Sequence, residues 1–589
     1  MRDANQLVLL AFWCVVLLGL PFWWKTTEVY RAHLPIAEVE SWQTREASTF
    51  TLPTKISLIV PTWLLPNDDK AHLYQSMASS IGSELTKQLE GLSSCMTFPI
   101  HVQLETWSTD DLTTEGIHTI LHQPTNTTVG QYNYYFHSSD VQPSKSKQEQ
   151  ANVIVGKNRA SVIRLDKLDE DTIKSVVLSL VPALFKTEYE TLSEIASCST
   201  GQVDKYDANS MRTFKYSSQY QITFSLMNNN PQSMAIGWDI RSAVKSYLYP
   251  LLNELSDVSN FTVDSQIQNY APLSQEPKFM ERQGNPNYYY FTPDQLPHFV
   301  NSADWNLASS ISSYPTVNFI LYSPSADVTP LRIHDLHGNS TTRSRIGIIF
   351  TSTNKPLRSV GKPLLSNSFL IPRWGGVTIK NPPRNMSSES QYSISKSDLQ
   401  PMMRIFISQL RSLMGVPDIS SSASRILPPG LNVTFLYATH TGITTLEKDN
   451  LIRRRTMENM VNAISTLRSL GQLVMEIPNM VVLDHIQNQV RQSLTSIRSV
   501  RDALDKGDYD HALKHSVDAI ELSEKAFFDP TMVSMLYFPD EHKYAIYMPL
   551  FVPISVPLCM ALIKTLKKWK SRNNSPPTTS PLESKSKSE

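Results

Sequence analysis

The chain has 589 residues, enough for about two to four ordinary domains with sizeable hydrophobic cores. Its 54 basic and 54 acidic residues give a formal net charge of zero, so a general surface for nucleic acid is not expected. Only 19 glycines are present, and no glycine-rich motif of the kind that cradles phosphate occurs. We therefore expect neither a nucleic-acid partner nor a cofactor.

The first predicted element is a membrane-spanning helix at residues 7–24, LVLLAFWCVVLLGLPFWW, which contains no charged residue. A run of this length approaches the hydrocarbon thickness of a bilayer, which is roughly 30 Å. A cleaved signal peptide is the alternative, but bulky residues from Pro21 to Trp24 stand where small residues would mark the cleavage site. We interpret the run as an uncleaved anchor and place residues 1–6 in the cytoplasm.

Residues 25–443 alternate between two hydrophobic patterns. Apolar runs rich in β-branched residues predict strands, and apolar positions at helical spacing predict helices between them. The expected strands are 55–62, 100–107, 132–136, 152–155, 161–165, 219–227, 260–268, 316–322, 345–351, 377–380 and 431–438. The expected helices are 69–92, 171–185, 236–255 and 398–414, with an irregular loop packed by its aromatic residues at 270–304. The segment is predicted to be a mixed α/β domain.

Five Asn-x-Ser/Thr triplets in this segment have the form of N-glycosylation acceptors. Because single triplets arise by chance, only their number and agreement with the other topology signals carry weight. The candidate acceptors are Asn126, Asn260, Asn339, Asn385 and Asn432. They predict that the α/β domain lies in the lumen of the secretory pathway. In that oxidising compartment Cys95 and Cys198 are either paired or free, and the sequence leaves both readings open.

Residues 444–544 are helical in pattern almost throughout. Apolar positions recur at three- and four-residue spacing on both sides of Gly507, which predicts an antiparallel helical hairpin. The turn and the second helix look like part of a tetratricopeptide repeat, but a single copy cannot form a solenoid. We therefore predict a plain lumenal helical bundle.

A second membrane-spanning helix is predicted at residues 545–563, an uncharged run that is again long enough to cross a bilayer. Five basic residues follow it and one precedes it, so residues 564–589 are predicted to lie in the cytoplasm. Because this tail consists mostly of Ser, Pro and Lys, it is also predicted to be disordered. Pro549, Pro553 and Pro557 fall four residues apart and share one helical face. Because each proline removes an amide donor, this face is predicted to pack against other membrane proteins.

No motif in the sequence defines a catalytic or metal site. His334 and His337 have a spacing that metal ligands can adopt, but no further His or Cys cluster completes a shell, so we interpret them as part of a polar loop. Cys95 and His101 are neighbours in sequence only, whereas a catalytic triad is a spatial arrangement. We expect no catalytic residue and no metal ligand.

Two short motifs remain ambiguous in function. The run Arg453 to Arg455 is interpreted as the solvated face of a helix, with an anion or lipid-headgroup site as the alternative. In Pro372-Arg-Trp-Gly-Gly-Val, the paired glycines allow close backbone approach, and Arg373 and Trp374 are typical interface anchors. A tight strand entry with a half-buried Trp374 is the alternative.

Several stretches resemble one protein family, PIG-S, whose members are the S subunit of the glycosylphosphatidylinositol (GPI) transamidase. They are residues 20–31 (LPFWWKTTEVYR), 372–377 (PRWGGV), 523–530 (SEKAFFDP) and 536–551 (LYFPDEHKYAIYMPLF). The resemblance implies a two-span protein of the endoplasmic reticulum with a lumenal bulk and cytoplasmic termini. It also implies a non-catalytic scaffolding role in the complex that joins GPI anchors to the C-terminal end of precursor proteins.

In that family the chemistry belongs to a separate caspase-like subunit. This chain has no caspase-like Cys and His pair, so no catalytic residue is carried over. Contact with the precursor peptide or with the GPI lipid is left open. A lumenal hydrolase would instead need a pocket with convergent titratable groups, and a lipid-handling or chaperone-like membrane protein would need a hydrophobic lumenal groove.

Overall fold

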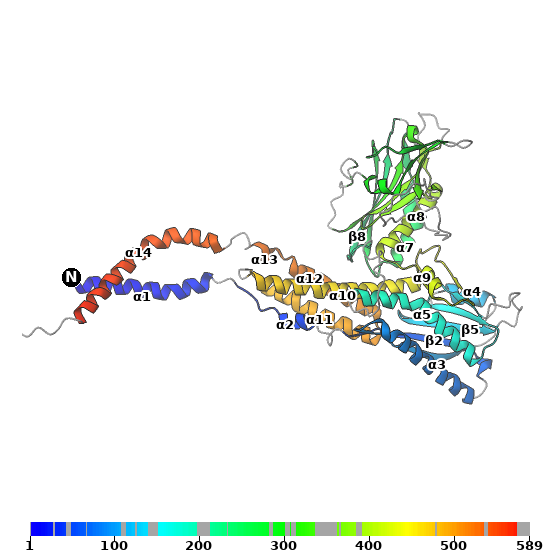
Figure 1. The fold of residues 1–589 in the computed structure, drawn as a ribbon, viewed down its shortest axis with the longest axis horizontal. Helices are drawn as coiled ribbons and strands as arrows, with labels where there is room; N and C mark the ends of the chain where they lie inside the picture. The colour runs from blue at the N-terminus through cyan, green and yellow to red at the C-terminus, as the bar shows by residue number, and fades with distance from the viewer. Residues whose placement is uncertain are drawn as a thin grey trace, which may run out of the picture. The chain divides into compact units, whose positions relative to one another are not determined.

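The computed structural model describes most of the chain, and the description that follows concerns these residues alone. They are 2–27, 30–42, 49–65, 68–107, 114–123, 126–138, 151–196, 213–232, 234–281, 287–300, 305, 307, 314–335, 362–363, 367–383, 392–477, 480–534 and 540–573. The chain forms two compact units (Figure 1). The smaller contains Met1–Glu40, Ile464–Ser493 and Glu521–Glu589, and the larger contains Ser41–Ala463 and Leu494–Ile520.

The first sheet of the larger unit has six strands in the order β19-β6-β7-β5-β2-β4. They are β2 (Thr54–Pro61), β4 (Ile100–Trp107), β5 (Gln131–Ser138), β6 (Ala151–Val155), β7 (Ala160–Leu165) and β19 (Leu431–Phe435). All neighbours run parallel except β6 and β7. Strand β2 is buried at every position but Lys55, as its continuous apolar run requires when helices and strands cover both faces.

Three helices accompany this sheet: α3 (Asp68–Leu89), α4 (Thr114–His122) and α5 (Glu170–Ile195). Helix α3 packs against β4 and α5, and α4 packs against β7 (Figure 1). Helix α5 continues about three turns past Phe185, where the predicted helix ends, although Pro182 lies inside it. Burial of Val181, Ala183 and Leu184 around the proline offsets the backbone hydrogen bond that proline removes.

The second sheet has five strands in the order β10-β8-β13-β17-β16. They are β8 (Gln219–Asn228), β10 (Asn260–Asn269), β13 (Thr316–Ser323), β16 (Ser368–Ile371) and β17 (Gly375–Ile379). The strands are parallel except for the hairpin of β16 and β17. Helix α8 (Lys396–Met414) packs against β17. The segment predicted as one helix at 236–255 begins instead with strand β9 (Ile236–Trp238) and continues as α6 (Ile240–Ala243), η4 (Val244–Leu248) and α7 (Tyr249–Glu254).

The prediction of an irregular loop at 270–304 is partly wrong. The segment contains β11 (Lys278–Met280), β12 (Tyr288–Phe291) and the short helix η5 (Pro293–His298). Strand β12 pairs with β14 (Leu331–Asp335) in a small sheet that β15 (Lys362–Pro363) completes. The aromatic packing is as predicted: Phe291, Phe299 and Trp305 are buried in one cluster with residues of β13 and β17.

The turn of the β16–β17 hairpin is the Pro372-Arg-Trp motif, with Trp374 half-buried. Arg373 has a φ of 54°, a left-handed conformation that side chains other than glycine rarely adopt. A Cβ on Gly375 would lie 1.8 Å from the carbonyl oxygen of Asn318, and a Cβ on Gly376 would lie 1.9 Å from Oε1 of Gln409. The paired glycines therefore let the hairpin lie directly against β13 and α8.

The C-terminal region is helical, as predicted. Its long elements are α10 (Thr445–Glu476), α11 (Asp484–Lys506) and α12 (Tyr509–Phe527). Each of these three helices has residues in both units. Gly507, with a φ of 73°, makes the turn between α11 and α12. The mixed α/β architecture with a helical C-terminal region is thus confirmed. The remaining short elements are α2 (Ile36–Ser41), α9 (Ile419–Ile426), α13 (Pro530–Ser534), β1 (Phe50–Thr51), β3 (Met96–Thr97), β18 (Tyr392–Ile394), η1 (Thr62–Leu64), η2 (Glu90–Leu92) and η6 (Ala326–Val328).

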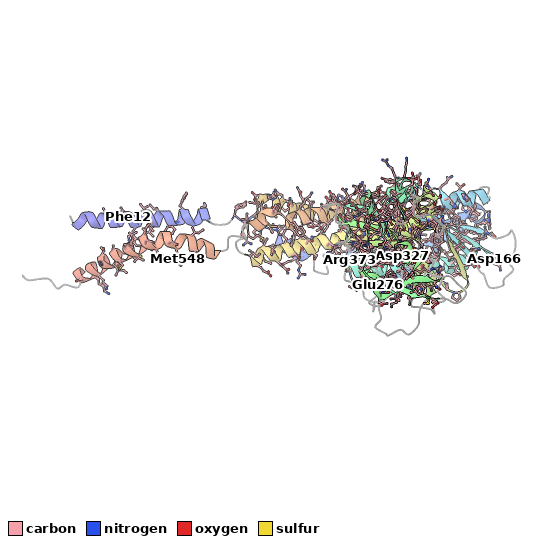
Figure 2. All side chains as sticks on the ribbon, turned by 90° about the horizontal axis from the view of Figure 1, so that it is seen from above. Phe12, Asp166, Glu276, Asp327, Arg373 and Met548 are labelled. Atoms are coloured by element: carbon pink, nitrogen blue, oxygen red, sulfur yellow. The ribbon has the colours of Figure 1, made fainter. Side chains whose placement is uncertain are left out.

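The smaller unit contains the two terminal helices, α1 (Arg2–Thr27) and α14 (Asp540–Asn573), which lie side by side (Figures 1 and 2). The segment after α1 is tied to the start of α11, because the Ala32 amide donates to the carbonyl oxygen of Val482 at 2.8 Å. Within the described residues, no helix has both the length and the apolarity needed to cross a membrane. The structure therefore does not support the two predicted spans at 7–24 and 545–563.

Substitution of Gly375 by Ala should destabilise the larger unit by about 2–4 kcal/mol, because the added methyl group meets backbone atoms of β13 that cannot move independently. Chemical unfolding of the full chain measures the change. Gly237→Ala is the matched control: it also lies in a strand, but nothing stands within 4 Å of its Cβ position. Equal stability of the two variants would contradict the close approach.

Candidate functional site

The three consecutive arginines of α10 are buried, so their interpretation as a solvated face is wrong. Arg453 is 0% exposed, Arg454 9% and Arg455 1%. The neighbouring positions Ile452 and Met457 are buried as well, and α10 is surrounded by protein along this stretch. A charge inside a protein must be paired, so each guanidinium requires a carboxylate partner nearby.

Arg453 forms a bidentate ion pair with Glu188 of α5. Its Nε and Nη2 atoms donate to the two carboxylate oxygens at 2.5 and 2.8 Å. Its Nη1 atom donates to the hydroxyl of Tyr132 on β5 at 3.2 Å, and the guanidinium lies 5.4 Å from the ring centre of Tyr509 on α12. This single side chain therefore joins α10 to α5, to β5 of the first sheet and to α12.

Asp449 lies one helical turn before Arg453 and carries the opposite charge into the same region. Its carboxylate accepts two hydrogen bonds from Arg159, from Nε and Nη2, each at 2.7 Å. The Tyr132 hydroxyl donates to it at 3.2 Å. Tyr132 thus stands between the two ion pairs and links them into one network.

Burial and charge shift the pKa values of this network. Burial lowers the pKa of Arg453, but the charge of Glu188, with the further help of Tyr132, outweighs it and holds the pKa well above its usual value. Burial also raises the pKa of Tyr132 well above its ordinary value, although Arg453 opposes this. Burial raises the pKa of Tyr189, the neighbour of Glu188, to about 12. The arginine is charged and the tyrosines are neutral at physiological pH.

Arg454 and Arg455 face residues that flank the second sheet. Both donate to the carboxylate of Glu458, at 2.8 Å from Arg454 and 2.7 Å from Arg455. Arg455 also donates to the carbonyl oxygens of Met414 at 2.8 Å and Phe214 at 3.2 Å. Burial alone would raise the pKa of Glu458, but the charges of Arg455 and Arg454 outweigh it and lower that pKa.

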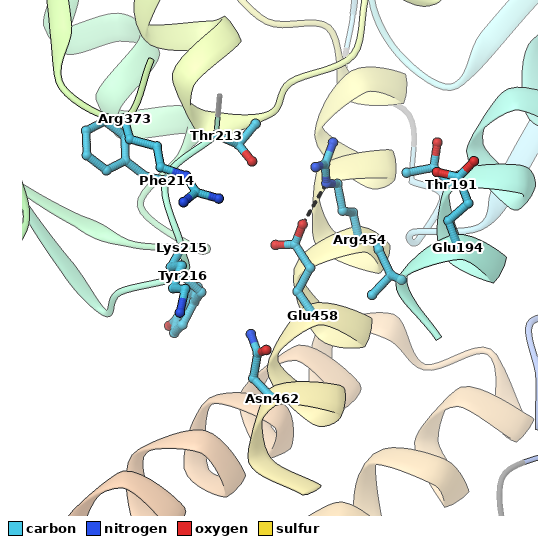
Figure 3. Close-up of a pocket in the computed structure, with 11 residues that line it drawn as sticks. Thr191, Glu194, Thr213, Phe214, Lys215, Tyr216, Arg373, Arg454, Glu458 and Asn462 are labelled. Carbon is cyan, nitrogen blue, oxygen red and sulfur yellow. Dashed lines mark hydrogen bonds and ion pairs between the residues drawn. The ribbon is translucent and has the colours of Figure 1, made fainter. Parts of the chain in front are cut away.

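A cavity of about 270 Å³ lies beside this part of α10 (Figure 3). It is lined by Thr191, Glu194, Ile195, Thr213, Phe214, Lys215, Tyr216, Arg373, Arg454, Glu458 and Asn462. Figure 3 shows Arg373, from the β16–β17 turn, on the opposite side of the cavity from Arg454 and Glu458. The cavity therefore collects charged groups from α5, α10 and the second sheet.

The predicted glycosylation acceptors fall into two groups. Asn126, Asn260 and Asn432 are exposed, in the loop before β5, at the start of β10 and in β19. Asn339 and Asn385 lie outside the described residues. Strands β10 and β19 are edge strands, so Asn260 and Asn432 are sterically accessible to a glycan.

The remaining residues that the sequence analysis singled out include a buried histidine, a disulfide-bonded cysteine and three exposed prolines. His334 is buried in β14 rather than in a polar loop, stacked 4.1 Å from the ring of Tyr290, and its Nε2 lies 3.1 Å from the Tyr288 hydroxyl. Cys95 is bonded in a disulfide, and both His337 and Cys198 lie outside the described residues. Pro549, Pro553 and Pro557 are exposed on α14.

Sequence reasoning missed Glu188 and Glu458, which neutralise the arginine run, and Asp449, which pairs with Arg159. Glu458 could have been found, because it lies four residues after Arg454 and three after Arg455 on a helix, where such pairs meet. Glu188 could not, because it is 265 positions from Arg453. An available signal for burial is that apolar residues surround the arginines on every side of α10.

These observations define a two-sheet α/β protein whose charged groups meet along one buried helix. The sequence model described as "Phosphatidylinositol-glycan biosynthesis class S protein" matches residues 10–572. The chain belongs to this family, PIG-S, as the resemblance of its sequence motifs suggested.

Curated relatives align with nearly the whole chain. A Bos taurus protein named "GPI-anchor transamidase component PIGS" is 32% identical over 567 residues, 94% of each chain. The Schizosaccharomyces pombe "GPI transamidase component PIG-S homolog" is 28% identical over 96% of this chain and 84% of its own. The Saccharomyces cerevisiae "GPI transamidase component GPI17" is 24% identical over 90% of this chain and 86% of its own.

Replacement of Arg453 by Met should lower the free energy of unfolding by about 3–5 kcal/mol, because it leaves the Glu188 carboxylate buried without its partner. The double variant R453M/E188M should recover part of this loss, since it removes both charges. Chemical unfolding of the full chain measures both. Arg404→Met, at an exposed position of α8, is the control and should change stability by no more than about 0.5 kcal/mol. A double variant less stable than R453M alone would contradict the pairing.

Glu458 should make stability depend on acid pH. Because its pKa is lower in the folded chain than the unfolded value of about 4.3, its contribution is fully present above that value and is lost as the pH falls through the folded pKa. Glu458→Gln should therefore destabilise the chain at neutral pH and flatten the fall in stability below about pH 4.3. Denaturant unfolding at a series of pH values measures this slope, and an unchanged slope in the variant would contradict the assignment.

Proposed function

We propose that this chain is a non-catalytic scaffolding subunit of the GPI transamidase complex, which attaches GPI anchors to the C-terminal end of precursor proteins in the endoplasmic reticulum. The observation that carries the proposal is membership of the PIG-S family across residues 10–572, together with relatives from mammals and two yeasts whose names place them in this complex. Those names favour this function over a lumenal hydrolase and over a lipid-handling or chaperone-like protein.

The buried charged groups pair with one another inside the protein, and this supports a scaffolding role. Arg453 and Tyr132, whose pKa values are shifted far from the ordinary range, are engaged with Glu188 and Asp449 inside the protein. Perturbed groups often mark catalytic sites, but structural ion-pair networks perturb pKa values in the same way. Here the network holds helices and a sheet together. The bond-making chemistry is then the task of a separate caspase-like subunit, with which this chain would assemble.

We extend the proposal to attachment at the membrane of the endoplasmic reticulum through α1 and α14, with residues 25–544 on the lumenal side. Large apolar side chains are exposed along both helices, among them Phe12 at 55% and Met548 at 61% (Figure 2). Exposed apolar surface of this extent marks a membrane or protein contact. The exposure of Asn126, Asn260 and Asn432 is compatible with glycans on the lumenal part.

The proline face of α14 is available to a partner. Phe551, Ser555 and Leu558 line an apolar cavity that α14 shares with Trp13, Val16 and Gly19 of α1. Successive helical residues are turned by about 100°, so the prolines lie roughly on the opposite side of α14 from these residues. The carbonyls four residues before each proline have lost their usual amide donor. A partner helix that covers this face could satisfy them, as in other membrane proteins with prolines inside helices.

Affinity purification of the full chain in mild detergent tests the proposal. The wild-type chain should be recovered with a stoichiometric set of other transamidase subunits, including the caspase-like one. Recovery of the chain alone would overturn the assignment to the complex and would favour one of the two alternative functions.

Replacement of Pro549, Pro553 and Pro557 by Leu together should reduce recovery of the partners several-fold while the chain remains in the membrane fraction, because the face loses its shape and its free carbonyls. The matched control replaces Met548 and Phe551 by Leu and Leu566 by Met, which changes three exposed apolar residues that lie well away from the prolines around the helix. The same recovery from both triple variants would show that the proline face is not where the partners pack.

A further inference from the structure

The cavity beside α10 has more cationic than anionic side chains at its wall. Arg454 and Arg455 share the single carboxylate of Glu458. Lys215 and Arg373 also line or border the cavity, and within the described residues neither side chain has an ion pair or hydrogen bond. Even with Glu194 counted as fully ionised, the cations at this cavity outnumber the anions.

Arg454 is poised toward the cavity as well. It is nine-tenths buried, its Nε is bonded to Glu458 and its Nη1 lies 3.4 Å from the carbonyl oxygen of Gly415. Its Nη2 group has no hydrogen-bond partner among the described residues, although the side chain lines the cavity (Figure 3). A guanidinium donor that lacks a protein partner and opens onto a cavity is available to water or to a ligand.

Arg373 is held at the cavity by a rigid turn. Its backbone has the left-handed φ of 54°, and the two residues after Trp374 are glycines pressed against β13 and α8. A strained residue on a loop that a rigid scaffold fixes is a common arrangement at binding sites. The turn therefore fixes the backbone of Arg373 beside the cavity, and the side chain itself is exposed.

We propose that this cavity binds a phosphate group, through Arg373 and Lys215 on one side and Arg454 on the other. A phosphate monoester carries nearly two negative charges and three terminal oxygens, which match three cationic donors that come from three separate segments. A single carboxylate would leave one of these donors unpaired. The cavity volume of about 270 Å³ is small for a ligand site, so it fits a compact group with little more than its ester carbon atoms.

The phosphate has two chemical sources, a soluble phosphate ester and the headgroup of a phospholipid. Phe214 and Ile195, which line the same cavity, provide apolar contact for the carbon atoms next to the phosphate in either case. The site does not depend on the proposed assembly with other subunits, because every residue that lines it belongs to this chain.

Titration calorimetry on the full chain, purified in a maltoside detergent that contains no phosphate, tests the soluble source with inorganic phosphate and glycerol 3-phosphate. Flotation with phosphatidylcholine vesicles, with and without phosphatidic acid, tests the lipid source. We expect binding to at least one of these probes, weakened tenfold or more by Arg373→Ala and by Lys215→Ala and lost in the double variant. Binding of the soluble probes assigns the site to small esters, and binding of phosphatidic acid alone assigns it to a headgroup.

The matched controls are Arg404→Ala and Lys245→Ala, exposed cations of the same unit that do not line the cavity. They should bind the probes as the wild-type chain does, and thermal unfolding should show that all variants are folded. Failure of every probe to bind would overturn the proposal, as would equal binding by the cavity variants and the controls. Neither result would alter the recovery of partner subunits, so the two proposals are tested separately.

Discussion

The ion pair between Arg453 and Glu188 is the interaction on which the arrangement of the larger unit depends. Both side chains are almost fully buried, at 0% and 2% exposure, so neither charge can exist there without the other. The pair fixes the rotation of α10 and its position along α5. Because Arg454 and Arg455 follow directly in the chain, the same constraint delivers them to Gly415, Met414 and Phe214 beside the second sheet. The position of α10 that this ion pair fixes therefore sets the contacts of the helix at both sheets.

The parts of the fold that follow local hydrophobic pattern could be predicted from the sequence. Strand β2 is a short apolar run and β8 alternates between polar and apolar residues, while the amphipathic spacing of α3 and α8 is regular, so local pattern is enough to find them. The irregular segment at 270–304 was harder, because β11 and β12 have only three and four residues. Strands that short carry no readable alternation, and the pairing of β12 with β14 is a long-range event.

The burial of the arginine run could not be predicted, for a different reason. A run of charges on a helix is usually solvated, and only a partner of opposite charge from elsewhere in the fold makes the interior tolerable. That partner, Glu188, sits in an apolar helix whose sequence does not show which charge it will meet. The placement of His334 has the same character: its neighbours Tyr288 and Tyr290 are brought in by strand pairing, which no local pattern reveals.

Strand β19 closes the first sheet from far along the chain. It pairs with β6, while all the strands of the second sheet lie between the two in sequence. During translation, β6 would therefore remain an open edge until all the strands of the second sheet have been synthesised. An open edge invites pairing with other chains, so newly made polypeptide would depend on chaperones for longer than a protein whose sheets are completed one after the other.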